Sequence, residues 1–281
     1  MTMTHVEASL DSDYQIACYF SLRPALRLII FLHGWRGETM ESWAGFEPWN
    51  LPENEWWNCA DLVFVGYDSL RDDPRAVAAD FRALTEMLYP RPHRFARRLR
   101  RDFWGEEAEN QYEELIVAAH SLGGLIARKA VLEAFTAWQY RRNMAAGYRR
   151  PPILDAGQRL FSPASAGFRP AGFLGAFKAT NVWGSTVEPA LRTGIAFQDL
   201  QPGSSLIVDT RAETVAAVGD PDAGALRARI VWARPDKVVE TAKYASDQWE
   251  CYLKGTSHET VCKPSSTFVA PWEFVSTGVV S

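Results

Sequence analysis

A serine stands between an apolar run and a run of good helix formers. Residues 114–119 read ELIVAA, and HSLGG follows before LIARKAVLEAF begins. In a small-x-Ser-x-Gly pattern the chain turns sharply from a strand into a helix, and the serine hydroxyl stands at the strained apex. Ala119 and Gly123 supply the small side chains that such a turn needs. Ser121 is therefore predicted to be a nucleophile, and the alternative is a glycine turn that happens to contain a serine.

A serine hydroxyl needs a base that takes its proton. In folds with this strand–turn–helix, the three catalytic residues follow one another along the chain in the order serine, acid, histidine. One histidine in the terminal segment and two others that precede the serine are therefore set aside. These are His5, His33 and His93. His120 adjoins Ser121 and is expected to point away from the apex. His258, in a loop after the last expected strand, is predicted to be the base, and the alternative is a surface histidine.

An acid is expected between Ser121 and His258. Asp236 follows the apolar run 228–233 (ARIVWA), and functional groups collect at the carboxyl ends of parallel strands. Its carboxylate would accept the ring N–H of His258, fix the tautomer and stabilise the imidazolium. The alternative for Asp236 is a turn residue after proline. Asp209 is the second candidate. Two further acids are weaker candidates: Glu188 and Asp199.

The oxygen that becomes negative during attack on a carbonyl needs backbone N–H donors. One donor would be the amide of Leu122, at the start of the helix, where the helix dipole helps. The other is expected from Trp35 in the loop LHGWRG, whose glycines let the backbone turn its N–H groups inward. The alternative is that this loop is only a tight turn. Three residues would support the site: His33, Gly34 and Gly123.

Nearly continuous apolar runs at 25–32, 61–67 and 114–119 predict strands that are buried on both faces, as in a parallel sheet. Pro74–Leu88 has apolar residues at helical spacing, with proline in its first turn and an aspartate before it. A second helix is expected over 122–140. Further strands are expected at 179–184, 228–233 and 249–254, with an extra edge strand at 14–20. The alternation predicts one α/β domain, a doubly wound, mostly parallel sheet with helices on both faces.

Two segments break the alternation, at 90–111 and 141–177. The first carries a basic and then an acidic cluster, and is expected to be a solvated helical insertion. The second is a candidate cap or lid. Its apolar residues could line an acyl pocket, contact a membrane transiently or pack onto the domain: Leu160, Phe161, Phe168, Phe173, Leu174 and Phe177. Aromatic residues after the glycine loop could wall a pocket or fill a core: Trp35, Trp43, Phe46, Trp49, Trp56 and Trp57.

The bulk composition excludes several classes of protein. Of 281 residues, 47% are hydrophobic and 23% charged, a globular balance, and the net charge of −4 gives no basic footprint for nucleic acid. No signal peptide and no membrane-spanning apolar run is visible. The four cysteines have no metal-type spacing, so reduced thiols in a cytoplasmic protein are expected, with a Cys251–Cys262 disulfide as an alternative.

The combination of FLHGWRG, VGYDS, AAHSLGGLIARKAV and SHETVCKP resembles the α/β-hydrolases, and looks most like their serine-esterase branch of lipase-like and inositol-deacylase-related proteins. The likeness runs from about residue 28 to 264. It implies a triad at Ser121, Asp236 and His258, and oxyanion donors at Trp35 and Leu122. Two departures are that alanine replaces the usual first glycine of the elbow, and that residues 183–185 read WGS where the branch has Thr-Pro-His.

Together these residues predict a serine hydrolase that cleaves a carboxylic ester through an acyl-enzyme, without metal or organic cofactor. The expected substrate is a small-molecule or lipid ester. A thioesterase or amidase using the same triad is an alternative. A non-catalytic binding or signalling module that keeps the elbow is another, from a different class of protein.

Overall fold

The computed structural model describes residues 4–10, 15–105, 111–142, 144, 148–169 and 195–281. Its strands form one sheet in the order β1-β2-β4-β3-β5-β6-β7-β8. All neighbouring pairs from β4 to β8 are parallel, and β2 pairs antiparallel with both β1 and β4. The strands are β1 (His5–Ser9), β2 (Ile16–Ser21), β3 (Arg27–Leu32), β4 (Ala60–Val65), β5 (Glu114–His120), β6 (Gly157–Phe161), β7 (Arg229–Arg234) and β8 (Trp249–Lys254).

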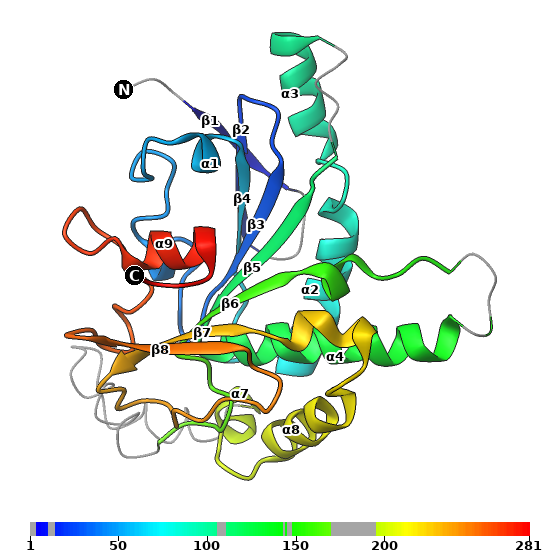
Figure 1. The fold of residues 1–281 in the computed structure, drawn as a ribbon, viewed down its shortest axis with the longest axis vertical. Coiled ribbons are helices and arrows are strands. Elements are labelled where there is room, and N and C mark those ends of the chain that lie inside the picture. The colour runs from blue at the N-terminus through cyan, green and yellow to red at the C-terminus, as the bar shows by residue number, and fades with distance from the viewer. Residues whose placement is uncertain (1–3, 11–14, 106–110, 143, 145–147, 170–194) are drawn as a thin grey trace.

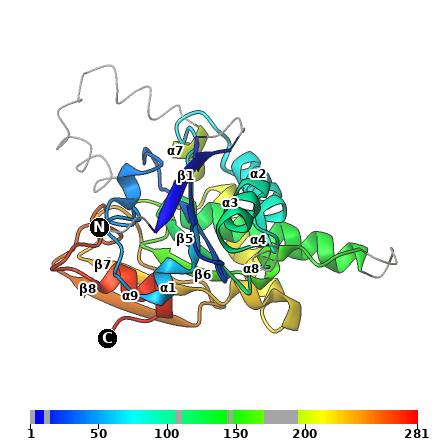
Figure 2. The same cartoon turned by 90° about the horizontal axis from the view of Figure 1, so that it is seen from above.

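Helices cover both faces of this sheet (Figures 1 and 2). The α-helices are α1 (Glu55–Asn58), α2 (Pro74–Leu88), α3 (Arg94–Trp104), α4 (Leu122–Arg141), α7 (Ile195–Asp199), α8 (Ser205–Ala217) and α9 (Ala270–Thr277). Alternate residues of β3 enter two separate cores. Ile30 packs with residues of α2 and α4, whereas Phe31 packs with residues of α9. Burial on both faces explains why the central strands are continuously apolar.

The predicted α/β architecture is confirmed. The helix expected over Pro74–Leu88 is α2, with proline in its first turn and the side chain of Asp73 accepting a hydrogen bond from the Arg75 amide. The strand expected at 14–20 is β2, but it is not at the edge, because β1 pairs with its outer side. The strand expected at 179–184 lies outside the described residues.

The segment 141–177 is not wholly an insertion, because Gly157–Phe161 forms β6 between β5 and β7. That part of the prediction is wrong. Polar Gln158 and Arg159 interrupt the apolar pattern that marks the other central strands, although Gln158 is buried. Leu160 and Phe161 pack into the two cores on opposite faces of the sheet, not in a cap. Phe173, Leu174 and Phe177 lie outside the described residues.

The expected helix within 90–111 is α3, which projects at one end of the molecule (Figure 1). The helix is not solvated on all sides as expected, because Arg100 is buried and forms an ion pair with the buried Asp61. Asp61 also accepts hydrogen bonds from Tyr112 Oη at 2.5 Å and from the Ser21 amide at 2.8 Å. These bonds satisfy a carboxylate that burial would otherwise penalise.

The aromatic residues after the glycine loop belong mainly to the core. Trp43, Phe46 and Trp57 are buried on the α9 side of the sheet, where Trp43 and Phe46 pack on Phe31 and Trp57 packs on Phe46. Trp49, by contrast, is exposed. All four cysteines are free thiols. Among the helices in the described ranges, none combines the length and apolarity that crossing a bilayer requires.

Candidate active site

Ser121 occupies a strained turn between β5 and α4. Its backbone has φ 54° and ψ −120°, a conformation that costs a residue other than glycine on the order of 1–3 kcal/mol. Three backbone hydrogen bonds of about 3.0 Å hold the turn: the Ser121 amide donates to Phe161 O, and Ser121 O accepts from the amides of Gly124 and Ala164. Neighbouring β6 and the chain after it therefore hold Ser121 in place. The predicted strand–turn–helix around Ser121 is present.

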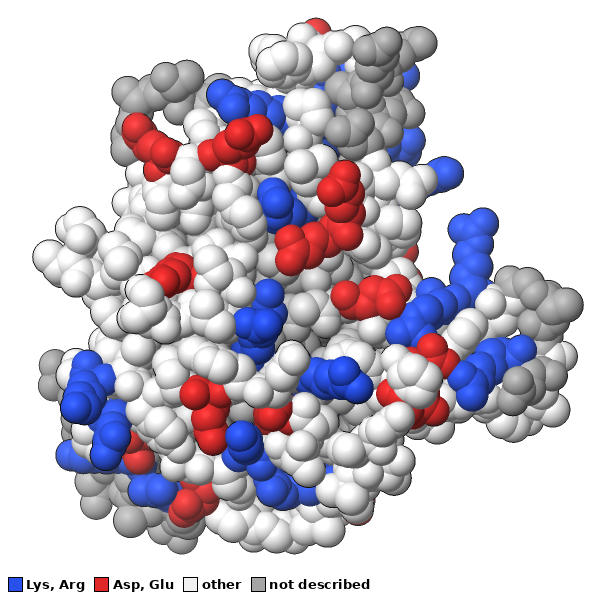
Figure 3. Space-filling view, viewed as in Figure 1, with Lys and Arg blue, Asp and Glu red and all other residues white. Residues whose placement is uncertain are grey.

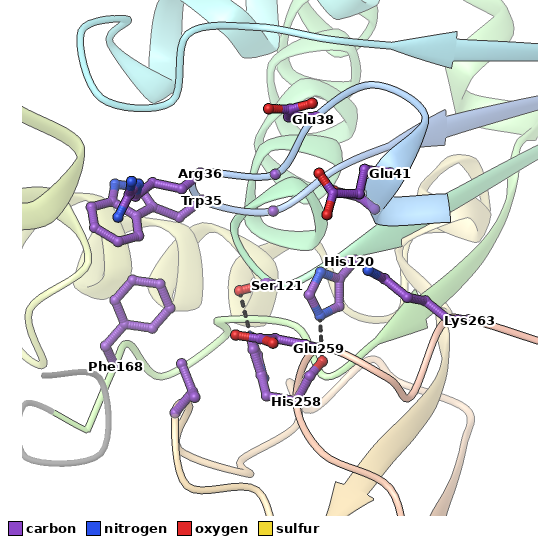
Figure 4. Close-up of a pocket in the computed structure, with 14 residues that line it drawn as sticks. Trp35, Arg36, Glu38, Glu41, His120, Ser121, Phe168, His258, Glu259 and Lys263 are labelled. Carbon is purple, nitrogen blue, oxygen red and sulfur yellow. Dashed lines mark hydrogen bonds between the residues drawn. The ribbon is translucent and has the colours of Figure 1, made fainter. Parts of the chain in front are cut away.

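Three predicted site residues from distant parts of the chain meet at this turn. His258 Nε2 lies 2.9 Å from Ser121 Oγ (Figure 4), and His258 Nδ1 lies 2.9 Å from Asp236 Oδ2. Each of the three is at least nine-tenths buried. Among the other acids considered, Asp209 is exposed on α8 and Asp199 forms an ion pair with Arg75. Glu188 lies outside the described residues.

Asp236 is held as a carboxylate. It follows β7, and its Oδ1 accepts the amides of Val238 at 2.9 Å and Val239 at 3.1 Å, which leaves Oδ2 for His258. Burial raises the pKa of Asp236, but the hydrogen bond and charge of His258, with the two amides, outweigh burial and bring the pKa down to about 2. The acid is therefore ionised at neutral pH and can stabilise a protonated His258.

The loop after β3 is fixed by His33. Its Nε2 accepts the Tyr67 amide at 3.1 Å, so the ring proton is on Nδ1, which donates to Gly34 O at 2.7 Å. The Tyr67 ring stacks on the His33 ring with centroids 4.3 Å apart, and Tyr67 Oη donates to His33 O at 2.9 Å. Burial lowers the pKa of His33, which keeps the ring neutral. The loop is thereby held in one conformation beside Ser121.

Two glycines let this loop and the turn come together. A Cβ on Gly34 would stand 2.7 Å from Ser121 Cβ, and a Cβ on Gly123 would stand 2.4 Å from the carbonyl oxygens of both Leu32 and His33. Trp35 follows Gly34 and lines the cavity above Ser121. Leu122 is the first residue of α4, where the amide has no acceptor within the helix. The proposed oxyanion donors, Trp35 and Leu122, thus belong to two segments in close contact.

Sequence reasoning missed His120. Its Nε2 donates to the main-chain oxygen of His258 at 2.8 Å, and the two rings lie 4.8 Å apart (Figure 4). The expectation that it points away from the site is wrong. Alternation along β5 puts His120 on the side of Ile116 and Ala118, in the core that also contains Val261 from the loop after His258. Strand alternation, combined with the placement of that loop, could have revealed it.

A cavity of about 370 Å³ opens over Ser121 and His258. Trp35, Phe168 and Val238 line it with apolar surface, and in Figure 4 Trp35 and Phe168 lie on the opposite side of Ser121 from Glu41 and Lys263. Five charged residues, from the glycine loop, the short helix after it and the His258 loop, also line it: Arg36, Glu38, Glu41, Glu259 and Lys263. Within the described part of the chain, no cluster of three or more His, Cys, Asp or Glu side chains could hold a metal ion.

Solved structures of other proteins match nearly the whole chain. The carboxylesterase CesB (YbfK) of Bacillus subtilis superposes with a TM-score of 0.50 at 12% identity, covering 99% of this chain and 93% of that one. The chain has the α/β-hydrolase fold. The peroxisomal α/β-hydrolase Lpx1 of Saccharomyces cerevisiae gives a TM-score of 0.46 at 12% identity, with 99% of this chain and 88% of that one covered. No family model and no curated protein sequence matches.

This α/β-hydrolase fold was expected from the sequence alone. At 12% identity the structural likeness carries the fold and not the reaction. The chemistry of the site depends on its own residues. Those are a serine on a strained turn, a histidine within hydrogen-bond distance of it, and an ionised carboxylate behind that histidine.

Proposed function

We propose that this protein is a serine hydrolase that cleaves a carboxylic ester through an acyl-enzyme. One observation carries the proposal: an unbroken chain of hydrogen bonds runs from Asp236 through His258 to the Oγ of Ser121, and Ser121 lines a cavity. This arrangement supplies a nucleophile, a base and a group that orients the base.

In the proposed reaction, Ser121 Oγ attacks the ester carbonyl carbon while its proton passes to His258 Nε2. Asp236 stabilises the imidazolium, and the amides of Trp35 and Leu122 hold the negative oxygen of the tetrahedral intermediate. The C–O bond to the alcohol then breaks, and His258 returns its proton to the departing oxygen. Water attacks the acyl-enzyme by the same route, releasing the acid and restoring the Ser121 hydroxyl.

The strained backbone of Ser121 argues against a non-catalytic binding module. Holding that conformation costs on the order of 1–3 kcal/mol, and a binding surface gains nothing from it. The rings of Trp35 and Phe168 give one side of the cavity an apolar surface that suits an acyl group, although Arg36 lies beside Trp35 on that side (Figure 4). The carboxylesterase among the structural neighbours supports an ester, although the triad chemistry would also serve a thioester or an amide.

Small-molecule or lipid esters remain the proposed substrates, and the cytoplasmic setting stays a prediction. Transient membrane contact through 141–177 stays a prediction, since Phe173, Leu174 and Phe177 of that segment lie outside the described residues.

A p-nitrophenyl ester series from acetyl to palmitoyl tests the proposal, with Ser121→Ala as the control. A cavity of about 370 Å³ predicts the highest kcat/KM for short acyl groups. Rates that equal those of Ser121→Ala across the whole series would overturn the ester assignment. The ethyl ester, ethyl thioester and N-ethyl amide of the best acyl group then separate the alternatives, because the proposal predicts the highest kcat/KM for the oxygen ester.

A further inference from the structure

His120 has one ring nitrogen that the proposed reaction does not use. Its Nε2 faces a carbonyl oxygen, that of His258, so Nε2 carries the ring proton. Burial, followed by the nearby His258, lowers the pKa of His120 to about 3, so the ring is neutral near pH 7. Nδ1 must then be a hydrogen-bond acceptor with a free lone pair.

This nitrogen has no hydrogen-bond partner among the described residues, although His120 is only 8% exposed. His120 lines the cavity that contains Ser121. A Cβ on Gly34 would stand 3.0 Å from Nδ1, so any side chain at position 34 would cover the nitrogen. Because residue 34 is glycine, Nδ1 is left uncovered on the side of the glycine loop. Nδ1 is therefore an accessible acceptor in the cavity wall, where a ligand or a water molecule can supply the donor.

His120 lies on the polar side of the cavity. In Figure 4 the side chains of Glu41 and Lys263 reach toward its ring, whereas Trp35 and Phe168 lie on the other side of Ser121. The polar side therefore offers acceptors at His120 and Glu41 and a donor at Lys263. A hydroxyl group both donates and accepts hydrogen bonds, so hydroxyls match this mixture of groups.

The chemistry assigns the two sides of the cavity to the two halves of an ester. His258 must deliver a proton to the departing oxygen, so the alcohol half has to lie against His258. His120 is next to His258, with the rings 4.8 Å apart, and the apolar surface of Trp35 and Phe168 is left for the acyl half.

We propose that His120 Nδ1 accepts a hydrogen bond from a hydroxyl group on the alcohol half of the substrate. The substrate class is then an ester of a hydroxylated alcohol, with Glu41 and Lys263 placed to contact further hydroxyls. This inference rests on the proposed ester hydrolysis and names the substrate class for the same site.

A pair of butanoate esters tests the acceptor directly. The 2-hydroxyethyl and 2-methoxyethyl esters have alcohols of similar leaving ability, but only the first has an O–H that can donate. The wild-type protein is expected to show a kcat/KM about threefold to tenfold higher for the hydroxyethyl ester, the effect of one uncharged hydrogen bond. Equal values, or a preference for the methoxyethyl ester, would overturn the inference while leaving ester hydrolysis intact.

Two substitutions at one position separate this role from the contact with His258. His120→Asn places its amide near the position of Nδ1 and His120→Gln places its amide near that of Nε2. The ratio between the two esters should persist in His120→Asn and fall to about one in His120→Gln, whatever overall rate each retains. The opposite pattern would overturn the inference. Absence of hydrolysis by the wild-type protein, for these and for the p-nitrophenyl esters, would instead reject the proposed function itself.

Discussion

His258 Nε2 lies 2.9 Å from Ser121 Oγ, although 137 positions separate the two residues in the chain. The main chain of His258 is also bonded, since its carbonyl oxygen accepts a hydrogen bond from His120. Two consecutive residues at the end of β5 therefore hold the ring and the backbone of the histidine. These two hydrogen bonds restrict the movement of His258, so the proposed base is already oriented for proton transfer from Ser121.

Asp236→Asn is expected to lower kcat by on the order of 10⁴-fold, as the same change does in a serine protease triad. An asparagine amide facing Nδ1 of His258 would favour the tautomer with a proton on Nε2, which cannot accept the Ser121 proton. The fold should persist, because the asparagine oxygen can still accept the Val238 and Val239 amides. Steady-state ester hydrolysis measures the effect.

The matched control is Asp209→Asn, which makes the same change on the exposed face of α8. Its kcat should equal that of the wild-type protein. A large loss in Asp209→Asn together with a small loss in Asp236→Asn would transfer the role of the acid to Asp209.

Gly34→Ala should disturb both the fold and the activity. Its Cβ would stand 2.7 Å from Ser121 Cβ, so the loop or the turn must shift. Overpacking of this kind costs about 1–3 kcal/mol of unfolding free energy, and a displaced Ser121 would lower kcat as well. Gly224→Ala is the control, because a Cβ there meets nothing within 4 Å. Equal stability and activity of the two variants in denaturant titrations and ester assays would show that the contact is not needed.

His120 predicts how the unfolding free energy depends on pH. In the native protein its pKa is about 3, whereas the unfolded chain has the usual value near 6.5. Between these values only the unfolded state binds the proton, so acid favours unfolding. From pH 7 to pH 5 this one group should remove about 2 kcal/mol of stability.

Urea titrations at the two pH values compare wild-type protein with His120→Gln. The stability lost by the variant between pH 7 and pH 5 should be smaller by about that amount, whatever its stability at pH 7. His5 and His33 also have lowered pKa values, but they are present in both proteins and cancel in the comparison. An identical loss in both proteins would mean that His120 is protonated in the folded state.

The sequence predicts much of this fold because the buried central strands are almost wholly apolar. The α2 pattern and the strand–turn–helix around Ser121 could also be located, since helical spacing and small residues at the turn are local signals. Strand β6 could not, because Gln158 and Arg159 break its pattern and only neighbouring strands place it in the sheet. The pairing of β1 outside β2 is likewise set by long-range contacts.

The order of the candidate catalytic residues along the chain could be predicted from the sequence, but the contacts of the residues around them could not. Chain order singled out His258 and favoured Asp236, because that fold constrains which residues can reach the serine. The role of His120 depends on where the loop after β8 returns over the sheet. Its contact with the His258 main chain joins residues 138 positions apart, so strand alternation alone could not predict it without the placement of that loop.

Labelling with a fluorophosphonate tests the central claim most directly, because the reagent forms a covalent bond with a serine oxygen that a base activates. Peptide mass spectrometry of the folded protein should find one adduct, on Ser121. The adduct should be absent after unfolding in urea and at background level in His258→Ala. A folded protein whose Ser121 remains unmodified, or an adduct that forms equally well in His258→Ala, would contradict this account.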